Sequence, residues 1–216
     1  ALGSFPTRNG HPFFNGEILM SFVSLLTGRV FQDLLQHGKE IEETIAHRDI
    51  RIRLLNHSTP ELERYFSRPL SELPRQNPYP VALLLPLFLV AFALNLLPFL
   101  SALQGLSPLH HALSFFVPSL TMTGALIVTS VLLARGRTSG LSGFMALFII
   151  LLITTLVQVL HVMLSHDGSL WPHVIASFAL LLCRVVMNGS GFVLFTLYCR
   201  TQRLARLARE MRLKSR

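Results

Sequence analysis

The chain has 216 residues, of which 51% are hydrophobic and 14% are charged, and its mean hydropathy is +0.52. Ordinary soluble domains carry about 25% charged residues, so this composition excludes a typical soluble protein and indicates a membrane protein. The formal net charge of +8 would also suit nucleic acid, so its position along the chain has to be considered.

The positive charge lies at the C-terminal end. Residues 1–80 hold nine basic and nine acidic side chains, which cancel, whereas residues 200–216 hold seven basic side chains and one acid, Glu210. A basic flank beside a membrane span is an ordinary cytoplasmic anchor. We therefore expect anionic lipid headgroups, and no nucleic acid, to be the partner of this charge.

Residues 1–75 are predicted to form a cytoplasmic, amphipathic helical region. Apolar residues recur along one face of a helix from about residue 17 to residue 47, although Gly28 and Gly38 make two shorter helices an equal alternative. The stripe must be buried against the membrane surface, the end of a helix bundle, a second copy or another protein. Its members are Leu19, Val23, Leu26, Val30, Leu34, Ile41 and Ile45.

A proline-rich connector at 76–80 precedes four apolar runs. Each run exceeds the roughly 20 residues that a helix needs to cross a bilayer. The predicted fold is an all-α integral membrane protein, a four-transmembrane-helix bundle preceded by the small helical cytoplasmic region. Its transmembrane domain covers 81–199, with spans at about 81–103, 109–134, 141–164 and 170–199, and a basic tail follows at 200–216.

The basic residues predict the topology. The loop between the first two spans has no charge and the loop between the last two has only Asp167, whereas the stretch that leads into the first span (with Arg68 and Arg75), the Arg135–Thr138 loop and the tail are basic. Basic loops stay in the cytoplasm. We expect both termini to be cytoplasmic and the protein to lie in a bacterial inner membrane.

Arg184 is the strongest functional signal in the sequence. It lies inside the predicted span 170–199, and the predicted spans contain no acidic residue that could neutralise it. A buried guanidinium in hydrocarbon costs between about 2.5 and well over 10 kcal/mol, so it should face a bundle interior, a wet cavity or a partner. A carboxylate on another subunit, an anionic headgroup or an anion path would each satisfy it.

Three amides are predicted to share the polar interior with Arg184. Asn188 falls on the same face of the fourth span as Arg184, Gln158 lies on a polar face of the third, and Asn95 lies in the first. Interhelical hydrogen bonds from such side chains, worth about 0.6 kcal/mol each, are an alternative explanation that involves packing alone.

Five histidines are weak candidates for a metal or haem site near one membrane face. Imidazole is a common ligand for zinc, copper and haem iron, but the spacing matches no ligand motif, and histidines with a polar tip in interfacial water explain the pattern as well. No metal and no cofactor is predicted. The residues are His110, His111, His161, His166 and His173.

The tail is predicted to bind anionic lipid headgroups, since each basic residue near a charged leaflet contributes about 1 kcal/mol. The four residues expected to do so recur at every third position: Arg200, Arg203, Arg206 and Arg209.

No family motif, nucleophile with an adjacent base, phosphate-binding loop or paired intramembrane carboxylates occurs in the chain. The leading hypothesis is a non-catalytic inner-membrane protein that assembles with itself or with membrane partners and regulates or anchors a cytoplasmic or secretion-type machine. Immunity, entry-exclusion and sensing proteins are of this type. The alternatives are an oligomeric pore or anion transporter that uses Arg184, and a membrane enzyme or redox subunit that uses the histidines.

Overall fold

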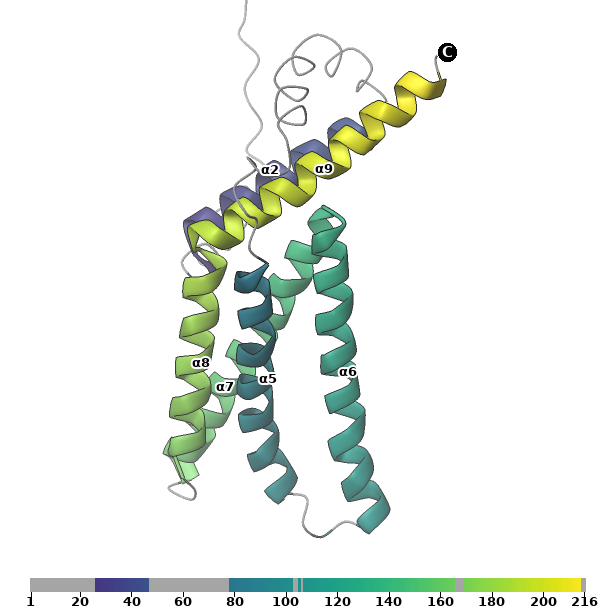
Figure 1. Cartoon of the computed structure of the whole chain (residues 1–216). Coiled ribbons are helices and arrows are strands. Elements are labelled where there is room, and N and C mark those ends of the chain that lie inside the picture. Colours follow the sequence, from purple (N-terminus) through teal and green to yellow (C-terminus); the bar gives the residue numbers. More distant parts are fainter. Residues whose placement is uncertain (1–25, 47–77, 103–104, 106, 166–168, 215–216) are drawn as a thin grey trace, which may run out of the picture.

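The computed structural model describes residues 26–46, 78–102, 105, 107–165 and 169–214, and all regular secondary structure within these ranges is helical. The predicted helical character of 1–25 and 47–75 lies outside the described residues. The helices, drawn in Figure 1, are α2 (Arg29–Ala46), α5 (Tyr79–Ala102), α6 (Pro108–Ala134), α7 (Thr138–Ser165), α8 (Trp171–Met187) and α9 (Ser190–Lys214).

Three helical segments are long and apolar enough to cross a membrane: Tyr79–Ser101, Pro108–Ala134 and Thr138–Ser165. The pair Trp171–Met187 and Ser190–Leu204 passes the same test together but is bent by 54°. By length and composition, the described helices fit a multi-pass membrane protein with three spans, or four if the bent pair counts as one.

The fourth apolar run differs from its prediction. The sequence predicts one helix over 170–199, but α8 ends at Met187 and α9 begins at Ser190. Asn188 and Gly189 lie at the break, and a glycine costs a helix about 1 kcal/mol relative to alanine. At about 1.5 Å per residue, α8 alone is about 25 Å long, slightly short of a hydrocarbon core of about 30 Å.

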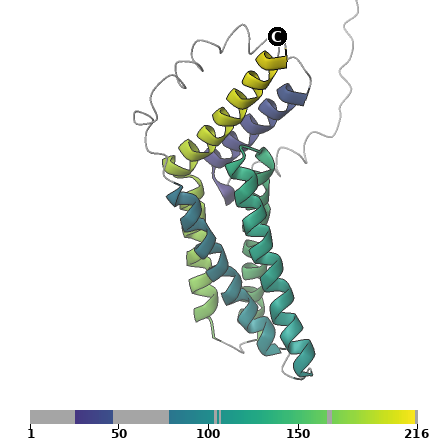
Figure 2. The ribbon, with the colours of Figure 1, turned by 45° about the vertical axis from the view of Figure 1, so that its right-hand side comes forward.

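After the break, α9 turns across one end of the bundle. Figures 1 and 2 both show α2 and α9 side by side over this end, and α5, α6, α7 and α8 running away from it. We call this end the capped end. The opposite end, which carries the connections around residue 105 and residue 169, is called the loop end.

The core reaches from the span helices into the capping helices. Phe88 of α5 lies 6.0 Å from Phe144 of α7, which lies 6.5 Å from Phe192 of α9, which lies 6.2 Å from Phe31 of α2, measured between ring centroids. All four rings are buried. The capping helices are therefore packed into the apolar core and do not merely rest on it.

The apolar face of α2 is covered by the capped end of the bundle, which was one of the predicted alternatives. Phe31, Leu34 and Leu35 are buried there, whereas Val30 of the predicted stripe is 47% exposed. The helix begins after Gly28, whose φ of +95° breaks the longer helix that the periodicity also allowed.

Candidate functional site: the joint at the capped end

Asn188 connects α2 to the break between α8 and α9. Its Nδ2 donates to the carbonyl oxygens of Thr27 at 2.6 Å and Arg184 at 2.8 Å, and its Oδ1 accepts the backbone N–H of Phe31 at 3.2 Å. Terminal N–H and C=O groups of helices have no partner within the helix. The amide therefore satisfies a backbone N–H in the first turn of α2. It is also a second donor to the Arg184 carbonyl, which already accepts the backbone N–H of residue 188 at 3.1 Å.

Gly28 makes room for this contact. Its φ of +95° lies in the left-handed region that side chains rarely adopt. A Cβ at this position would lie 2.1 Å from Oδ1 of Asn188. Glycine is thus required twice, for the backbone turn and for the close approach of the amide.

Arg200 of α9 makes a second contact with α2, near its middle. Only 4% of the residue is exposed, and its Nη2 donates to the carbonyl oxygen of Leu34 at 2.8 Å. A Cβ on Gly38 would lie 2.2 Å from the same Nη2, so the absence of a side chain there lets the guanidinium reach the backbone of α2.

Glu42 makes a third contact, toward the C-terminal end of α2. Its Oε1 accepts the backbone N–H of Thr138 at 2.8 Å and lies 3.2 Å from Nη1 of Arg203, which also donates to the carbonyl oxygen of Gly136 at 3.3 Å. Thr138 is the first residue of α7, where the helix dipole favours an anion. The carboxylate thus links α2 to α7 and α9.

The surroundings of Glu42 stabilise its charged form. Partial burial raises the pKa of this carboxyl group, but the hydrogen bonds from Thr138 and the ion pair with Arg203 outweigh burial and hold the pKa below its ordinary value. The docked position of α2 therefore favours the carboxylate over the carboxylic acid.

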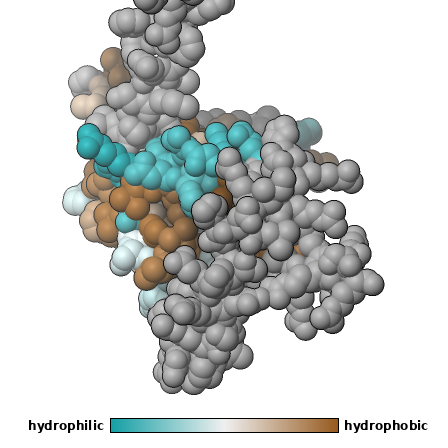
Figure 3. All heavy atoms as spheres, turned by 90° about the horizontal axis from the view of Figure 1, so that it is seen from above, coloured by the Kyte–Doolittle hydropathy of each residue, from teal (hydrophilic) through white to brown (hydrophobic). Residues whose placement is uncertain are grey.

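The opposite face of α2 points away from the bundle and is polar. Viewed from above, hydrophilic atoms form a band across the capped end beside apolar ones (Figure 3). The exposed polar residues of α2 carry charges of both signs, an arrangement suited to a protein partner of mixed charge. They are Arg29, Asp33, Gln36, His37, Lys39, Glu40 and Glu43.

Arg184 lies at the joint and not in the middle of a span. It occupies the last turn of α8, it is half-buried, and its carbonyl oxygen accepts a hydrogen bond from Asn188. The sequence indicated a central position because it gave no helix end at Asn188. With α8 ending there, the residue lies at the end of a helix beside the break.

Asn95 and Gln158 form a separate polar cluster within the bundle. Asn95 Nδ2 donates to the Ala91 carbonyl at 2.8 Å and to Thr155 Oγ1 at 2.9 Å, and Gln158 Nε2 donates to the Asn95 carbonyl at 2.8 Å. Oδ1 of Asn95 and Oε1 of Gln158 are buried without a partner among the described residues. The hydrogen bonds that Asn95 and Gln158 make within the described residues do not include Arg184, whereas Asn188 donates to the carbonyl oxygen of Arg184.

The four predicted histidines within the described ranges are His110, His111, His161 and His173. No group of three or more His, Cys, Asp or Glu side chains in the described ranges could hold a metal ion. His110 and His161 are exposed and His111 is half-buried, whereas His173 is buried with neither ring nitrogen partnered within those ranges. His166 lies outside the described residues.

The four arginines predicted to bind headgroups are in different surroundings. Arg200 is buried against α2, which corrects its predicted exposure to lipid, because its guanidinium is held by the Leu34 carbonyl. Arg203 is half-buried beside Glu42, and Arg206 is exposed. For Arg209 the structure describes the backbone of α9 alone.

Sequence reasoning did not identify the partners of Asn188. Thr27 and Phe31 carry no motif and bind Asn188 through backbone atoms. The contact of Glu42 with the backbone N–H of Thr138 carries no motif either. The pair Asn188-Gly189 inside an apolar run was the available signal, since asparagine and glycine commonly follow the end of a helix.

The joint thus consists of an amide, a buried guanidinium and an ion pair, spaced along one helix that they hold on the bundle. Such contacts are directional, and one of them depends on the charge of a carboxylate. Comparison of this chain with models of protein families, with curated proteins and with solved structures found no match.

Proposed function

We propose that the chain is a non-catalytic multi-pass protein of a bacterial inner membrane that presents α2 to a partner. It assembles with itself or with partner membrane proteins, and it anchors or regulates a cytoplasmic or secretion-type machine. The observation that carries this proposal is the seating of α2, which buries its apolar face on the bundle and turns a charged face outward.

The proposed orientation rests on the distribution of basic residues. Arg135 and Arg137 lie at the capped end, where α9 adds Arg203 and Arg206. The first connection at the loop end, residues 103–107, carries no charge, and the second, around Asp167, carries no Lys or Arg. Since Lys and Arg accumulate on the cytoplasmic side, the capped end faces the cytoplasm and both termini lie there.

The uneven packing of α6 supports assembly. Its buried residues, Met122, Leu126, Thr129 and Leu133, all lie in the half nearer the capped end. In the other half, Leu109 is 68% exposed, Phe116 58% and Leu120 71%. A membrane helix with an unpacked half offers van der Waals area to a second copy or a membrane partner, which is the main source of helix association in lipid.

The test places a photo-crosslinking amino acid at Gln36, on the exposed face of α2, in the full chain in intact cells. One discrete cytoplasmic partner is expected. The charge-reversal variant Asp33→Lys, Lys39→Glu, Glu43→Lys should lose the adduct, because these three side chains are exposed and the buried face of α2 is unchanged.

The matched control is Asp33→Glu, Lys39→Arg, Glu43→Asp, which keeps every charge and should keep the adduct. Native mass spectrometry of both variants should show the same assembly as the unaltered chain. No discrete adduct, or equal loss in the two variants, would contradict the proposed role of α2.

A further inference from the structure

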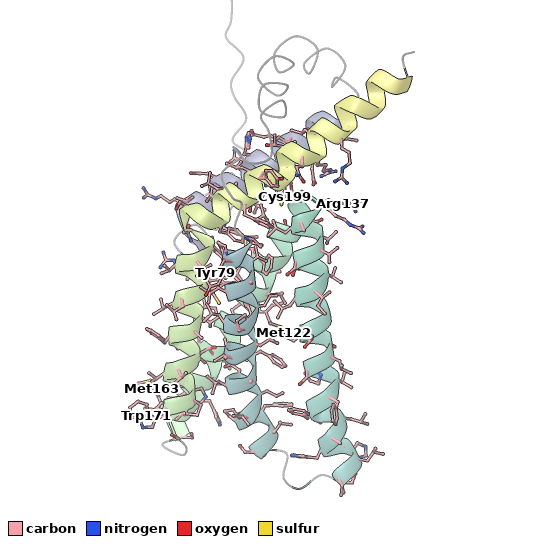
Figure 4. The ribbon with its side chains drawn as sticks, viewed as in Figure 1. Tyr79, Met122, Arg137, Met163, Trp171 and Cys199 are labelled. Carbon is pink, nitrogen blue, oxygen red and sulfur yellow. The ribbon has the colours of Figure 1, made fainter. Side chains whose placement is uncertain are left out.

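A pocket of about 190 Å³ lies under α9, at the end of α6. Its polar lining consists of Arg135 from the end of α6 and of Gln202, Arg203 and Arg206 from α9. Cys199, which also lines the pocket, and Arg137, which does not, are both labelled where α9 meets the end of α6 (Figure 4).

The pocket lining is strongly cationic. It holds three guanidinium groups and no acidic residue, and the nearest described carboxylate contact is Glu42 on Arg203, at 3.2 Å. Guanidinium groups bind phosphate oxygens through paired N–H donors. Gln202 donates to the hydroxyl of Tyr198 and so is already partly engaged.

The size of the pocket suits a phosphate group. A water molecule occupies about 30 Å³ of the liquid, so 190 Å³ has room for several waters or for one phosphodiester. The C-terminal carbonyls of α6 do not oppose an anion strongly. Those of Leu132 and Leu133 accept the N–H groups of Arg137 and Gly136 at 3.0 and 2.8 Å, the pattern of a Schellman turn.

The pocket lies at the depth of lipid headgroups if the capped end faces the cytoplasm, a point that rests on the proposed function. The 27 residues of α6 span about 40 Å, more than the roughly 30 Å of hydrocarbon. Residues just beyond Ala134 therefore fall in the polar layer. The cytoplasmic leaflet carries anionic lipids, which attract basic residues there.

We propose that this pocket binds the phosphate of an anionic phospholipid headgroup. Arg135 and Arg206 are the principal ligands, because neither side chain is hydrogen-bonded to another described residue, whereas Arg203 holds Glu42 and Gly136. The site includes Arg135 from the loop after α6, and it excludes the buried Arg200.

The simpler alternative is diffuse attraction of a basic surface to anionic lipid. With diffuse attraction, every exposed arginine would contribute equally to lipid binding. Arg137 is exposed, lies two residues from Arg135 and is outside the pocket, so it would then matter as much as Arg135. It would also make lysine as good as arginine, because only charge would count. A built site requires the fork of donors that arginine has and lysine lacks.

The experiment reconstitutes the full chain in nanodiscs of phosphatidylcholine and phosphatidylglycerol and counts retained lipids by native mass spectrometry after gentle release. Retention of phosphatidylglycerol should fall roughly tenfold or more in Arg135→Gln/Arg206→Gln. It should fall less than about twofold in Arg137→Gln. The variant Arg206→Lys keeps the charge and is a conservative change for folding. Its retention of phosphatidylglycerol should be closer to that of the double variant than to that of the control.

Several results would overturn the proposal. One is an equal loss of bound phosphatidylglycerol in Arg137→Gln and in the pocket variants. Another is full retention of phosphatidylglycerol in Arg206→Lys, and a third is equal binding of phosphatidylglycerol and phosphatidylcholine by the unaltered chain. Inorganic phosphate that binds the chain in phosphatidylcholine discs and displaces all phosphatidylglycerol would reassign the pocket to a soluble anion. Lipid retention is measured without any protein partner, so its failure leaves the proposed role of α2 to the crosslinking test.

Discussion

Two asparagines, one at each of two polar clusters, differ in what they hold together. Asn188 at the capped end uses both its N–H groups and its oxygen on three backbone groups from two helices and the segment before α2. Asn95 inside the bundle donates twice, once to its own helix and once to α7, and its side-chain oxygen has no partner among the described residues.

The comparison separates a joint from a packing contact. Without the Asn188 side chain, the Thr27 carbonyl and the Phe31 N–H would lose this partner where α2 begins, whereas the Arg184 carbonyl would keep the backbone N–H of residue 188. Without Asn95, the bundle would lose two hydrogen bonds but would still be held by Leu84, Phe88 and Ala91 in the apolar core of α5. The same residue type therefore determines the position of an element in one place and only tunes stability in the other.

Replacing Asn188 with leucine should have the largest effect. The Thr27 carbonyl and the Phe31 N–H would lose this partner, and each group left without one costs about 1–3 kcal/mol. Docking of α2 should therefore weaken by about 3 kcal/mol. Amide exchange of residues 31–42 should then accelerate by roughly two orders of magnitude. Unchanged exchange in α2 would show that the amide is not the joint.

Gly28→Ala should produce the same release of α2 more weakly. The left-handed φ of Gly28 costs a non-glycine residue about 1–2 kcal/mol, and the new Cβ would displace the amide oxygen of Asn188. The matched control is Gly124→Ala on α6, where a Cβ would meet nothing within 4 Å. Amide exchange should accelerate in α2 for the first variant and remain unchanged for the second.

Asn95→Leu should destabilise the bundle by about 1 kcal/mol or less, because hydrogen bonds between membrane helices average about 0.6 kcal/mol. Exchange in α2 should be unaffected, since the hydrogen bonds of Asn95 within the described residues are to α5 and α7. Thermal unfolding in detergent measures the first effect and amide exchange the second. If this variant accelerated exchange in α2, Asn95 would also position α2, which would contradict the difference proposed between the two asparagines.

The Glu42 contact should give the smallest effect and a pH dependence. Because its pKa is lowered in the docked state, its contribution is present above the ordinary glutamate pKa of about 4.3 and is lost as the pH falls through the lowered value. Exposed ion pairs contribute about 0.2–1 kcal/mol. A fluorophore at Gln36→Cys should report loosening of α2 on acidification.

The control for that titration is Glu42→Gln. In this variant α2 should be loosened at all pH values, and the fluorescence change on acidification should be absent. Labelling is selective because Cys183 and Cys199 are buried. A transition that persists in Glu42→Gln would assign the pH dependence to another group.

Much of the helical architecture could be predicted from local sequence. The apolar runs at 81–103, 109–134 and 141–164 correspond closely to the candidate spans in α5, α6 and α7, because length and hydropathy are properties of a single segment. The run 170–199 has the same hydropathy pattern, yet it contains a bend of 54°. A hydropathy averaged over the whole run does not detect the helix break that a single Asn-Gly pair can cause.

The candidate site depended on contacts that join distant residues. Asn188 and Thr27 are separated by 161 positions, as are Arg203 and Glu42, and two of the groups bound by Asn188 are backbone carbonyls that every residue possesses. Arg184 was noticed for its charge, but its position in the last turn of a helix followed from where α8 ends.

The sequence alone determined that the described chain is helical and that it contains segments able to cross a membrane, since hydrophobic burial and backbone hydrogen bonding act within each segment. Only the tertiary structure decided that α2 is seated on the bundle, that Arg200 faces inward and that Arg135 and Arg206 line one pocket. Those outcomes depend on which polar groups remain unsatisfied once the helices have packed, and that is a property of the whole assembly of helices.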